Sequence, residues 1–155
     1  MADAKDSAIL EPFDASDYHV GVVIGLFNSH ITQPMKELVL KTLTEDYSVP
    51  ENQIYIIEVA GAADMPAALE ALARKDEVDC LVSIAAIIRG STAHFEYVAQ
   101  IITEGVKDVQ IKHAKPVAFG ALTVENEAQA IERIDHARGY AAATIHATKN
   151  IRSIS

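Results

Sequence analysis

The segment Ile87–Ala99 reads I-I-R-G-S-T-A-H-F-E-Y-V-A and joins an apolar run to a helical pattern. The apolar run that begins near Asp79 ends abruptly at Arg89-Gly90, and a short loop with two hydroxyl side chains follows. His94 then stands where apolar residues begin to recur at helical spacing. An apolar run of strand length that turns through glycine into a helix is typical of a β-α unit. The segment therefore predicts a strand-to-helix turn of an α/β protein.

The same pattern occurs four times along the chain, with β-branched apolar runs separated by stretches of helical spacing. The expected strands are residues 19–27, 54–59, 79–88 and 116–123. The expected helices are residues 32–47, a segment that ends near 75, residues 94–112, and the remainder from 125, interrupted near 135–139. For the first helix, Thr32 is the predicted N-cap and Pro34 lies in the predicted first turn.

Alternation of near-continuous apolar strands with helices implies a parallel sheet that is covered on both faces. Right-handed crossovers distribute the helices over two layers. The predicted fold is a three-layer α/β/α sandwich with a four-stranded parallel sheet, the flavodoxin-like arrangement. Residues 1–17 are acidic and aperiodic, so an N-terminal arm is expected there, followed by a single domain over residues 18–155.

The composition limits the partners and the compartment. The chain has 155 residues, half of them apolar, and can bury a core of its own. A net charge of −9 argues against a nucleic-acid backbone or an anionic membrane as the main partner. Cys80 is the single cysteine, and its apolar neighbours predict a buried thiol in a reducing compartment. Without a signal-peptide pattern or an apolar stretch of about 20 residues, the expected location is the cytoplasm.

Parallel sheets bind ligands beyond the carboxyl ends of their strands, so the strand-to-helix turns hold the candidate functional residues. In the third turn, Ser91 and Thr92 precede a helix whose free backbone N–H groups favour an anion. The same two residues are also typical helix N-caps, with Glu96 placed to complete a capping arrangement. His94 is either a neutral imidazole that passes a proton near pH 7 or a solvated helix-start residue.

In the first two turns, Phe27 and Asp64 each have a functional and a structural interpretation. Phe27 is a stacking platform for a planar ligand or the last core residue of its strand, and Asn28 beside it places an amide at the same sheet edge. Asp64 accepts hydrogen bonds from ligand hydroxyls or caps the second helix. No metal-ligand spacing, P-loop, dinucleotide-binding motif or serine-hydrolase motif occurs. Convergence of these turns at one sheet edge favours a binding site.

Four segments that cover about residues 19–133 resemble the 6,7-dimethyl-8-ribityllumazine synthase family. They read V-G-V-V-I-G-L-F-N-S-H-I-T, A-G-A-A-D-M-P, I-I-R-G-S-T-A-H-F-E-Y-V and F-G-A-L-T-V-E-N-E-A-Q-A-I-E-R. The resemblance implies a transferase of riboflavin biosynthesis that condenses 5-amino-6-(D-ribitylamino)uracil with 3,4-dihydroxy-2-butanone 4-phosphate to 6,7-dimethyl-8-ribityllumazine. It implies no metal and no organic cofactor. It also implies a homo-oligomer, a pentamer or an icosahedral assembly, with each site between adjacent subunits.

The resemblance assigns roles to individual residues of this chain. The pyrimidine and ribityl positions that it implies are Phe27, Asn28, Ala62, Ala63, Asp64, Ala86, Ile87 and Ile88. Among them, Phe27 stacks on the pyrimidine, residues 62–64 meet ring and ribityl hydroxyls, and the strand end 86–88 presents its backbone to the pyrimidine edge.

In the site that the resemblance implies, two subunits contribute residues to the part that binds the phosphate. Ser91 and Thr92 correspond to the phosphate loop, and His94 corresponds to a proton-transferring histidine. The neighbouring subunit supplies Phe119 and Arg133, and Arg133 grips the phosphate.

This chain departs from the family pattern at three places, and the one in the third turn, with Ala93 before His94 and Ser91 after Gly90, is a tolerable local change. The second turn usually reads P-G-A-F-E-I-P, so an aromatic side chain is lost at Ala63 and a glutamate is shortened to Asp64. The glycine- and lysine-rich segment that follows the position of Arg133 in the family is shorter here, with Arg138 as the remaining basic substitute. These departures keep a second function open, a non-catalytic member that binds a flavin-like ligand or forms an oligomeric shell. A branch that acts on a related ribitylamino substrate has less support, because the histidine loop follows the lumazine pattern.

Overall fold

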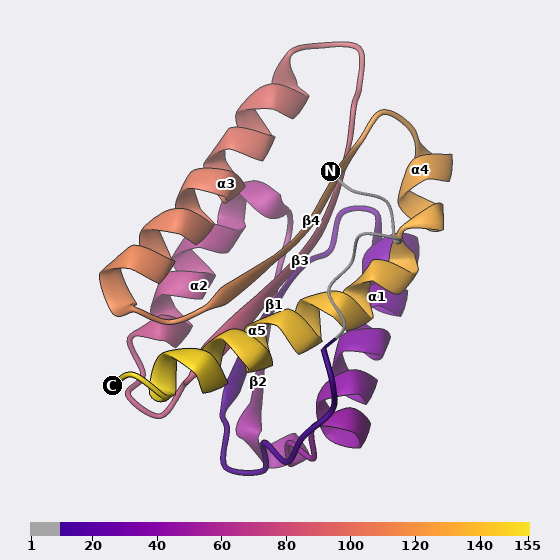
Figure 1. Ribbon diagram of the computed structural model, residues 1–155. Helices are drawn as coiled ribbons and strands as arrows, with labels where there is room; N and C mark the ends of the chain where they lie inside the picture. The colour runs from indigo at the N-terminus through magenta and orange to yellow at the C-terminus, as the bar shows by residue number, and fades with distance from the viewer. Residues whose placement is uncertain (1–9) are drawn as a thin grey trace.

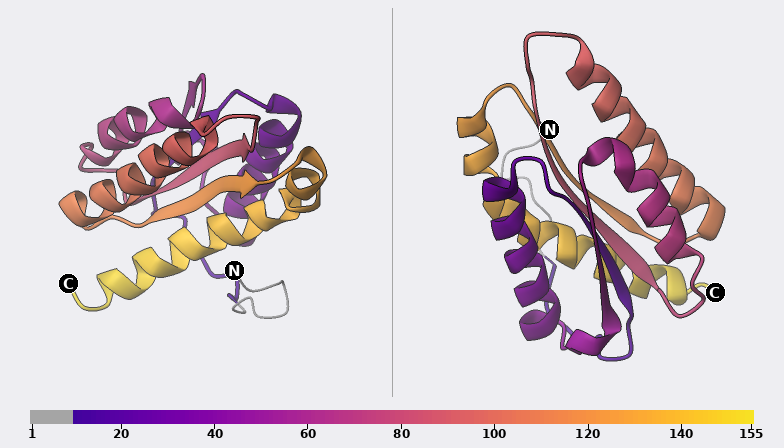
Figure 2. Two further views of the ribbon diagram at one scale, coloured as in Figure 1. Left: turned by 90° about the horizontal axis from the view of Figure 1, so that it is seen from above. Right: turned by 180° about the vertical axis from the view of Figure 1, so that it is seen from behind.

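A computed structural model describes residues 10–155 of the chain, so residues 1–9 of the expected N-terminal arm lie outside the described part. Its four parallel strands are β1 Val20–Gly25, β2 Ile54–Val59, β3 Cys80–Ile88 and β4 Val117–Val124. The longer helices are α1 Ser29–Lys41, α2 Met65–Ala73, α3 His94–His113 and α5 Ala137–Arg152, and α4 Glu127–Glu132 is short. Helices α2 and α3 cover one face of the sheet, and α1 and α5 cover the other (Figures 1 and 2). The predicted three-layer sandwich is confirmed.

The central strands are apolar throughout because both of their faces are covered. All of β1 and nearly all of β3 are buried. Side chains alternate between the two faces of a strand. Val22 and Ile24 of β1 therefore pack in the core under α1 and α5, whereas Val23 packs in the core under α2 and α3. Two apolar cores, one on each face, hold the sheet between its helical layers.

The strand order β2-β1-β3-β4 determines where a ligand can bind. β1 pairs in parallel with β2 on one side and with β3 on the other. The chain therefore leaves β1 toward one sheet edge and later returns to the opposite side of β1. In open α/β sheets this change of direction opens a crevice at the carboxyl ends of the strands concerned. The turns after β1 and β3 lie at that crevice.

The predicted start of the first helix is wrong. Asn28 adopts a left-handed backbone with φ 61°, which turns the chain from β1 directly into α1. The helix begins at Ser29, and Thr32 is a fully buried residue of its first turn rather than the N-cap. Pro34 consequently lies inside the helix and not in its first turn. Asparagine tolerates the left-handed region better than most residues, and the prediction did not use this property.

The other predicted elements agree closely with the structure. The second strand has the predicted bounds, and a π-helical turn over Thr42–Asp46 continues α1 to near its predicted end. A 3₁₀ turn over Ile134–His136 separates α4 from α5, as the interrupted pattern predicted. Cys80 is buried, and burial raises the pKa of its thiol to about 11. Among the helices of residues 10–155, none combines the length and apolarity that a membrane crossing requires.

Residues 10–17 contact the body of the same chain. Ala15 is buried, and its backbone N–H donates to the carbonyl of Tyr47 at 2.8 Å. The ring of Phe13 packs edge-to-face against Tyr47 and His146, with centroid distances of 5.4 and 5.0 Å. Nε2 of His146 lies 2.9 Å from the carbonyl oxygen of Glu11. These contacts attach the described part of the expected arm to α5 and to the end of the first helical region.

We expect Gly105→Ala to lower the free energy of unfolding by about 2 kcal/mol through overpacking between α2 and α3. A Cβ at Gly105 would lie 2.5 Å from Cγ of Pro66, whose rigid ring cannot rotate away. Gly139→Ala in α5 is the matched control, because a Cβ there meets nothing within 4 Å. The control gains up to about 1 kcal/mol of helix propensity. Denaturant unfolding of both variants measures the difference, and equal midpoints would contradict the proposed helix contact.

Candidate functional site

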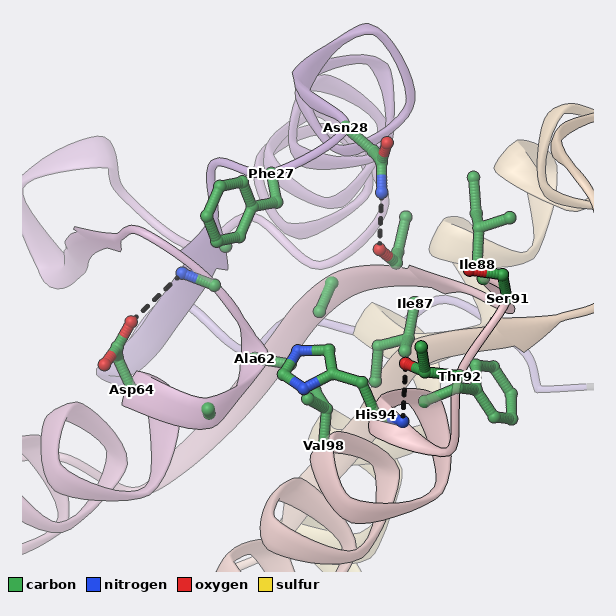
Figure 3. Close-up of a pocket in the computed structure, with 17 residues that line it drawn as sticks. Phe27, Asn28, Ala62, Asp64, Ile87, Ile88, Ser91, Thr92, His94 and Val98 are labelled. Carbon is green, nitrogen blue, oxygen red and sulfur yellow. Dashed lines mark hydrogen bonds between the residues drawn. The ribbon is translucent and has the colours of Figure 1, made fainter.

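A cavity of about 590 Å³ opens at the carboxyl ends of β1, β2 and β3, at the crevice that the strand order creates (Figure 3). This volume lies in the usual range for small-molecule sites. Every predicted site residue of the first three turns lines it: Phe27, Asn28, Ala62, Ala63, Asp64, Ala86, Ile87, Ile88, Ser91, Thr92 and His94. Three strand ends therefore bring together residues that are far apart in the sequence.

Phe27 forms part of the wall that follows β1. Its side chain is 68% exposed, so it is not a core residue of the strand. The backbone N–H of Phe27 donates to the carbonyl of Ala60 at 2.8 Å, which extends the β1–β2 pairing past the end of the strands. The ring lies against Gly61, where an added Cβ would come within 2.6 Å of Cδ2. Glycine at position 61 thus lets an aromatic face stand at the cavity mouth.

Asn28 links the first and third turns. Its side-chain amide donates from Nδ2 to the carbonyl oxygen of Ala86 at 2.9 Å (Figure 3). This bond crosses from the start of α1 to the end of β3, the two elements that border the crevice. The amide oxygen of Asn28 remains able to accept a hydrogen bond from a ligand.

The wall that follows β2 is formed by residues 62–64. Oδ2 of Asp64 accepts a hydrogen bond from the backbone N–H of Gly61 at 3.3 Å. Asp64 therefore stabilises its own 3₁₀ turn, Ala62–Asp64, and still presents carboxylate oxygens to the cavity. Ala62 is buried, whereas Ala63 is exposed and presents only a methyl group at the cavity.

The third turn provides hydrogen-bond acceptors for only some of the backbone N–H groups at the start of α3. Oγ1 of Thr92 accepts a hydrogen bond from the backbone N–H of His94 at 3.3 Å, and Ala93 occupies the N-cap position. Glu96 does not complete the capping arrangement that the sequence suggested, because its Oε1 accepts from Nη1 of Arg89 at 2.5 Å. This bond lowers the pKa of Glu96 and raises that of Arg89. Helix N–H groups at this end are thus available to an anion.

His94 lies on the opposite side of the cavity from Phe27 and Asn28 (Figure 3). Its imidazole points toward Ala62, with the hydroxyl of Thr92 on its other side. Within residues 10–155 no protein group hydrogen-bonds to the imidazole. Both ring nitrogens are therefore open to a ligand, and either tautomer is accessible.

The fourth turn does not reach this cavity. Asn126 caps α4 by accepting from the N–H of Gln129 at 3.0 Å, and Glu125 accepts from Nε of Arg89 at 2.7 Å. Phe119 is 39% exposed on the outer strand β4. Arg133 follows α4, and its Nη1 donates to the carbonyl of Gln129 at 2.9 Å. Phe119 and Arg133 therefore do not line this cavity.

Two apolar residues of α3 were missed by the sequence analysis. Phe95 and Val98 line the cavity together with His94. Residues one helical turn apart share a face, so the spacing from His94 to Val98 was a usable signal. The predicted site residues lay in the strand-to-helix turns and at the strand ends, and the helix residues after His94 were not considered. Among residues 10–155, no cluster of three or more metal-ligating side chains occurs.

The arrangement can bind a planar molecule with an anionic partner beside it. An exposed aromatic ring, an amide and a carboxylate line one half, and a helix start with two hydroxyls forms the other half. A histidine whose imidazole makes no hydrogen bond within residues 10–155 stands between them. General acid–base chemistry at a bound ligand needs such a group within hydrogen-bond reach of the reacting atoms.

Most of the chain matches a family model and a solved structure. Residues 17–152 match the sequence model of a family described as 6,7-dimethyl-8-ribityllumazine synthase. Among solved structures, the crystal structure of PH0766 from Pyrococcus horikoshii OT3 matches 91% of this chain with a TM-score of 0.42 and 14% sequence identity. The chain spans 38% of the length of that protein.

Proposed function

Because the chain belongs to the 6,7-dimethyl-8-ribityllumazine synthase family, whose reaction is part of riboflavin biosynthesis, we propose that it catalyses that reaction itself. It condenses 5-amino-6-(D-ribitylamino)uracil with 3,4-dihydroxy-2-butanone 4-phosphate. Imine formation, loss of phosphate and ring closure give 6,7-dimethyl-8-ribityllumazine. We propose a cytoplasmic homo-oligomer built from a single domain of residues 18–155, without a metal or an organic cofactor.

The pyrimidine fits the half of the cavity that borders β1 and β2. Phe27 is exposed at its mouth and offers a ring face for stacking. The backbone at Ala86–Ile88 supplies hydrogen-bonding groups for the pyrimidine edge. Carboxylate oxygens of Asp64 and the amide oxygen of Asn28 accept hydrogen bonds from the ribityl hydroxyls. All of these residues line one cavity.

The butanone phosphate fits the half that borders the third turn. Its phosphate accepts hydrogen bonds from the helix start and from the hydroxyls of Ser91 and Thr92. His94 then lies between the two substrates and moves protons during imine formation and phosphate loss. The substrate amine is already nucleophilic, so much of the acceleration comes from holding two reactants together.

One observation carries the proposal: an imidazole that makes no hydrogen bond within residues 10–155 separates an aromatic wall from an anion-binding loop in a single cavity. The direct test incubates the purified protein with both substrates and follows the absorbance and fluorescence of the lumazine. Formation of the lumazine above the uncatalysed rate is the expected result. A rate equal to that of the substrates alone would overturn the proposal.

The exposed methyl group at Ala63 favours a second candidate function. It leaves room beside Phe27 that an aromatic side chain fills in the usual family pattern. Loss of that contact area weakens substrate binding by about 1–2 kcal/mol. A non-catalytic protein would use the room for a flavin-like ligand or would serve as an oligomeric shell. Tight flavin binding without lumazine formation would support this function against the first.

We expect sedimentation at micromolar concentration to give at least a pentamer. Phe119 and Ile131 are exposed near the two ends of the β4–α4 segment, and Tyr97, Ile101 and Ile111 are exposed along α3. Apolar side chains on several surfaces are typical of a chain that buries them against copies of itself. In the proposed site, Phe119 and Arg133 of a neighbouring subunit complete each cavity, and this also requires contact between subunits. A stable monomer would contradict the shared site.

A further inference from the structure

Arg89 joins three elements around the third turn without lining the cavity. It directly follows β3, and its backbone N–H donates to the carbonyl of Val124 at 2.9 Å. Its guanidinium donates from Nε to Glu125, just after β4, at 2.7 Å and from Nη1 to Glu96, in the first turn of α3, at 2.5 Å. The ring of Phe95 lies under the guanidinium, 4.4 Å from Cζ to the ring centroid. We call this set of contacts the Arg89 clamp.

The loop that the clamp spans has little else to hold it. Residues 90–93 are exposed, and a Cβ at Gly90 would meet nothing within 4 Å. Their hydrogen bonds within the described chain are local: Thr92 accepts from His94, and Ala93 accepts from Glu96. None joins the loop to a strand or to another helix. The position of the loop therefore depends on how the first turn of α3 is fixed relative to β3 and β4.

Arginine is suited to this function because its planar guanidinium binds two carboxylates in fixed directions while it stacks on an aromatic ring. An isolated exposed ion pair contributes little, but a network with this geometry is more effective. The contacts with Phe95 and Glu96 attach Arg89 to two consecutive residues in the first turn of α3. Phe95 itself lines the cavity, so the clamp also orders part of its floor.

We propose that Arg89 is a positioning residue for the phosphate-bearing substrate. The clamp holds residues 90–93 so that the hydroxyls of Ser91 and Thr92 and the N–H groups at the start of α3 meet the phosphate together. Arg89 acts through Glu96 and Glu125 and does not contact the substrate. This inference rests on the proposed function, because the phosphate loop is assigned there.

Charge compensation is the competing explanation for any effect of Arg89. Glu96 and Glu125 are two carboxylates near the anion loop, and Arg89 offsets both. The two explanations give opposite signs for Glu96→Ala. The clamp requires Glu96, so its removal weakens phosphate binding. Charge compensation alone predicts that removal of a negative charge strengthens phosphate binding.

The experiment compares Arg89→Gln, Arg89→Lys and Glu96→Ala with the wild-type protein. For each variant, steady-state kinetics give the KM of both substrates, and inorganic phosphate is titrated calorimetrically as a probe of the loop. Arg74→Gln is the matched control, because Arg74 forms an exposed ion pair with Glu70 on α2 and lies outside the cavity. Thermal melting checks that each variant is folded.

We expect Arg89→Gln to raise the KM of the butanone phosphate and the Kd of inorganic phosphate about tenfold, with the KM of the pyrimidine within about twofold of wild type. Arg89→Lys recovers part of the loss, and Glu96→Ala shows a loss of the same sign. Unchanged phosphate affinity in Arg89→Gln, an equal rise of both KM values, or tighter phosphate binding in Glu96→Ala would overturn the clamp. A wild-type protein that forms no lumazine defeats the proposed function instead, and its phosphate Kd still tests the clamp.

Discussion

Arg133→Ala is expected to lower kcat/KM for the butanone phosphate by about thirty- to a thousandfold, because a charge-assisted contact of arginine with phosphate is worth about 2–4 kcal/mol. The guanidinium does not line the cavity of its own subunit. Its Nη1 donates to the carbonyl of Gln129 within α4, and the side chain is 38% exposed. A neighbouring subunit that binds against β4 and α4 can receive it. The KM of the pyrimidine should change little, because only the phosphate loses a contact.

Arg138→Ala is the control for this variant. Arg138 is the nearby basic residue in the shortened segment, and it is exposed at the start of α5. It should change kcat/KM by less than about threefold if Arg133 alone grips the phosphate. If Arg133→Ala changes kcat/KM by less than threefold, the phosphate is bound by Arg138 or by the helix start alone.

Mixed oligomers test whether the arginine acts across subunits. Arg133→Ala subunits keep an intact cavity, and His94→Ala subunits keep an intact arginine. If each site takes its cavity from one subunit and its arginine from the next, an equal mixture of the two impaired variants restores about one quarter of the sites to wild-type activity. No recovery after dissociation and reassembly would mean that both residues act within one chain.

The fold was predictable because its strands carry a strong and simple signal. A strand covered on both faces is apolar at every position, and β1 and β3 stand out in the sequence for that reason. The start of α1 was not predicted correctly, because Asn28 turns the chain by entering the left-handed region. The sequence shows an asparagine there but not its backbone angle. The strand order, and with it the crevice between β1 and β3, also required the structure.

The candidate site was predictable where conspicuous side chains follow strands. Phe27, Asp64 and His94 line one cavity because the carboxyl ends of parallel strands lie at one edge of the sheet. The function of Arg89 was not visible in the sequence, since its partners Glu96 and Glu125 lie on different elements. Long-range ion pairs leave no periodic pattern. Phe119 and Arg133 lie outside the cavity, and only the family resemblance suggested them.

His94→Ala is expected to lower kcat by about ten- to a hundredfold, at or below the usual contribution of a general acid–base residue. The imidazole lies inside the cavity between Ala62 and Thr92, and the proposed function puts it between the two substrates. The substrate amine needs no protein base to become a nucleophile, so the reaction persists without the histidine. Substrate binding and assembly should survive, because no protein group in residues 10–155 hydrogen-bonds to the imidazole.

His19→Ala is the matched control for the histidine. His19 precedes β1 at the opposite end of the sheet, where its Nδ1 lies 2.9 Å from the hydroxyl of Tyr55. Loss of this imidazole should leave kcat within about twofold of wild type, because it is remote from the cavity. Single-turnover kinetics with both substrates bound separate the chemical step from binding. An unchanged rate in His94→Ala would make His94 a solvated helix-start residue. Complete inactivity with dissociation of the oligomer would make it structural, and both results contradict proton transfer by His94.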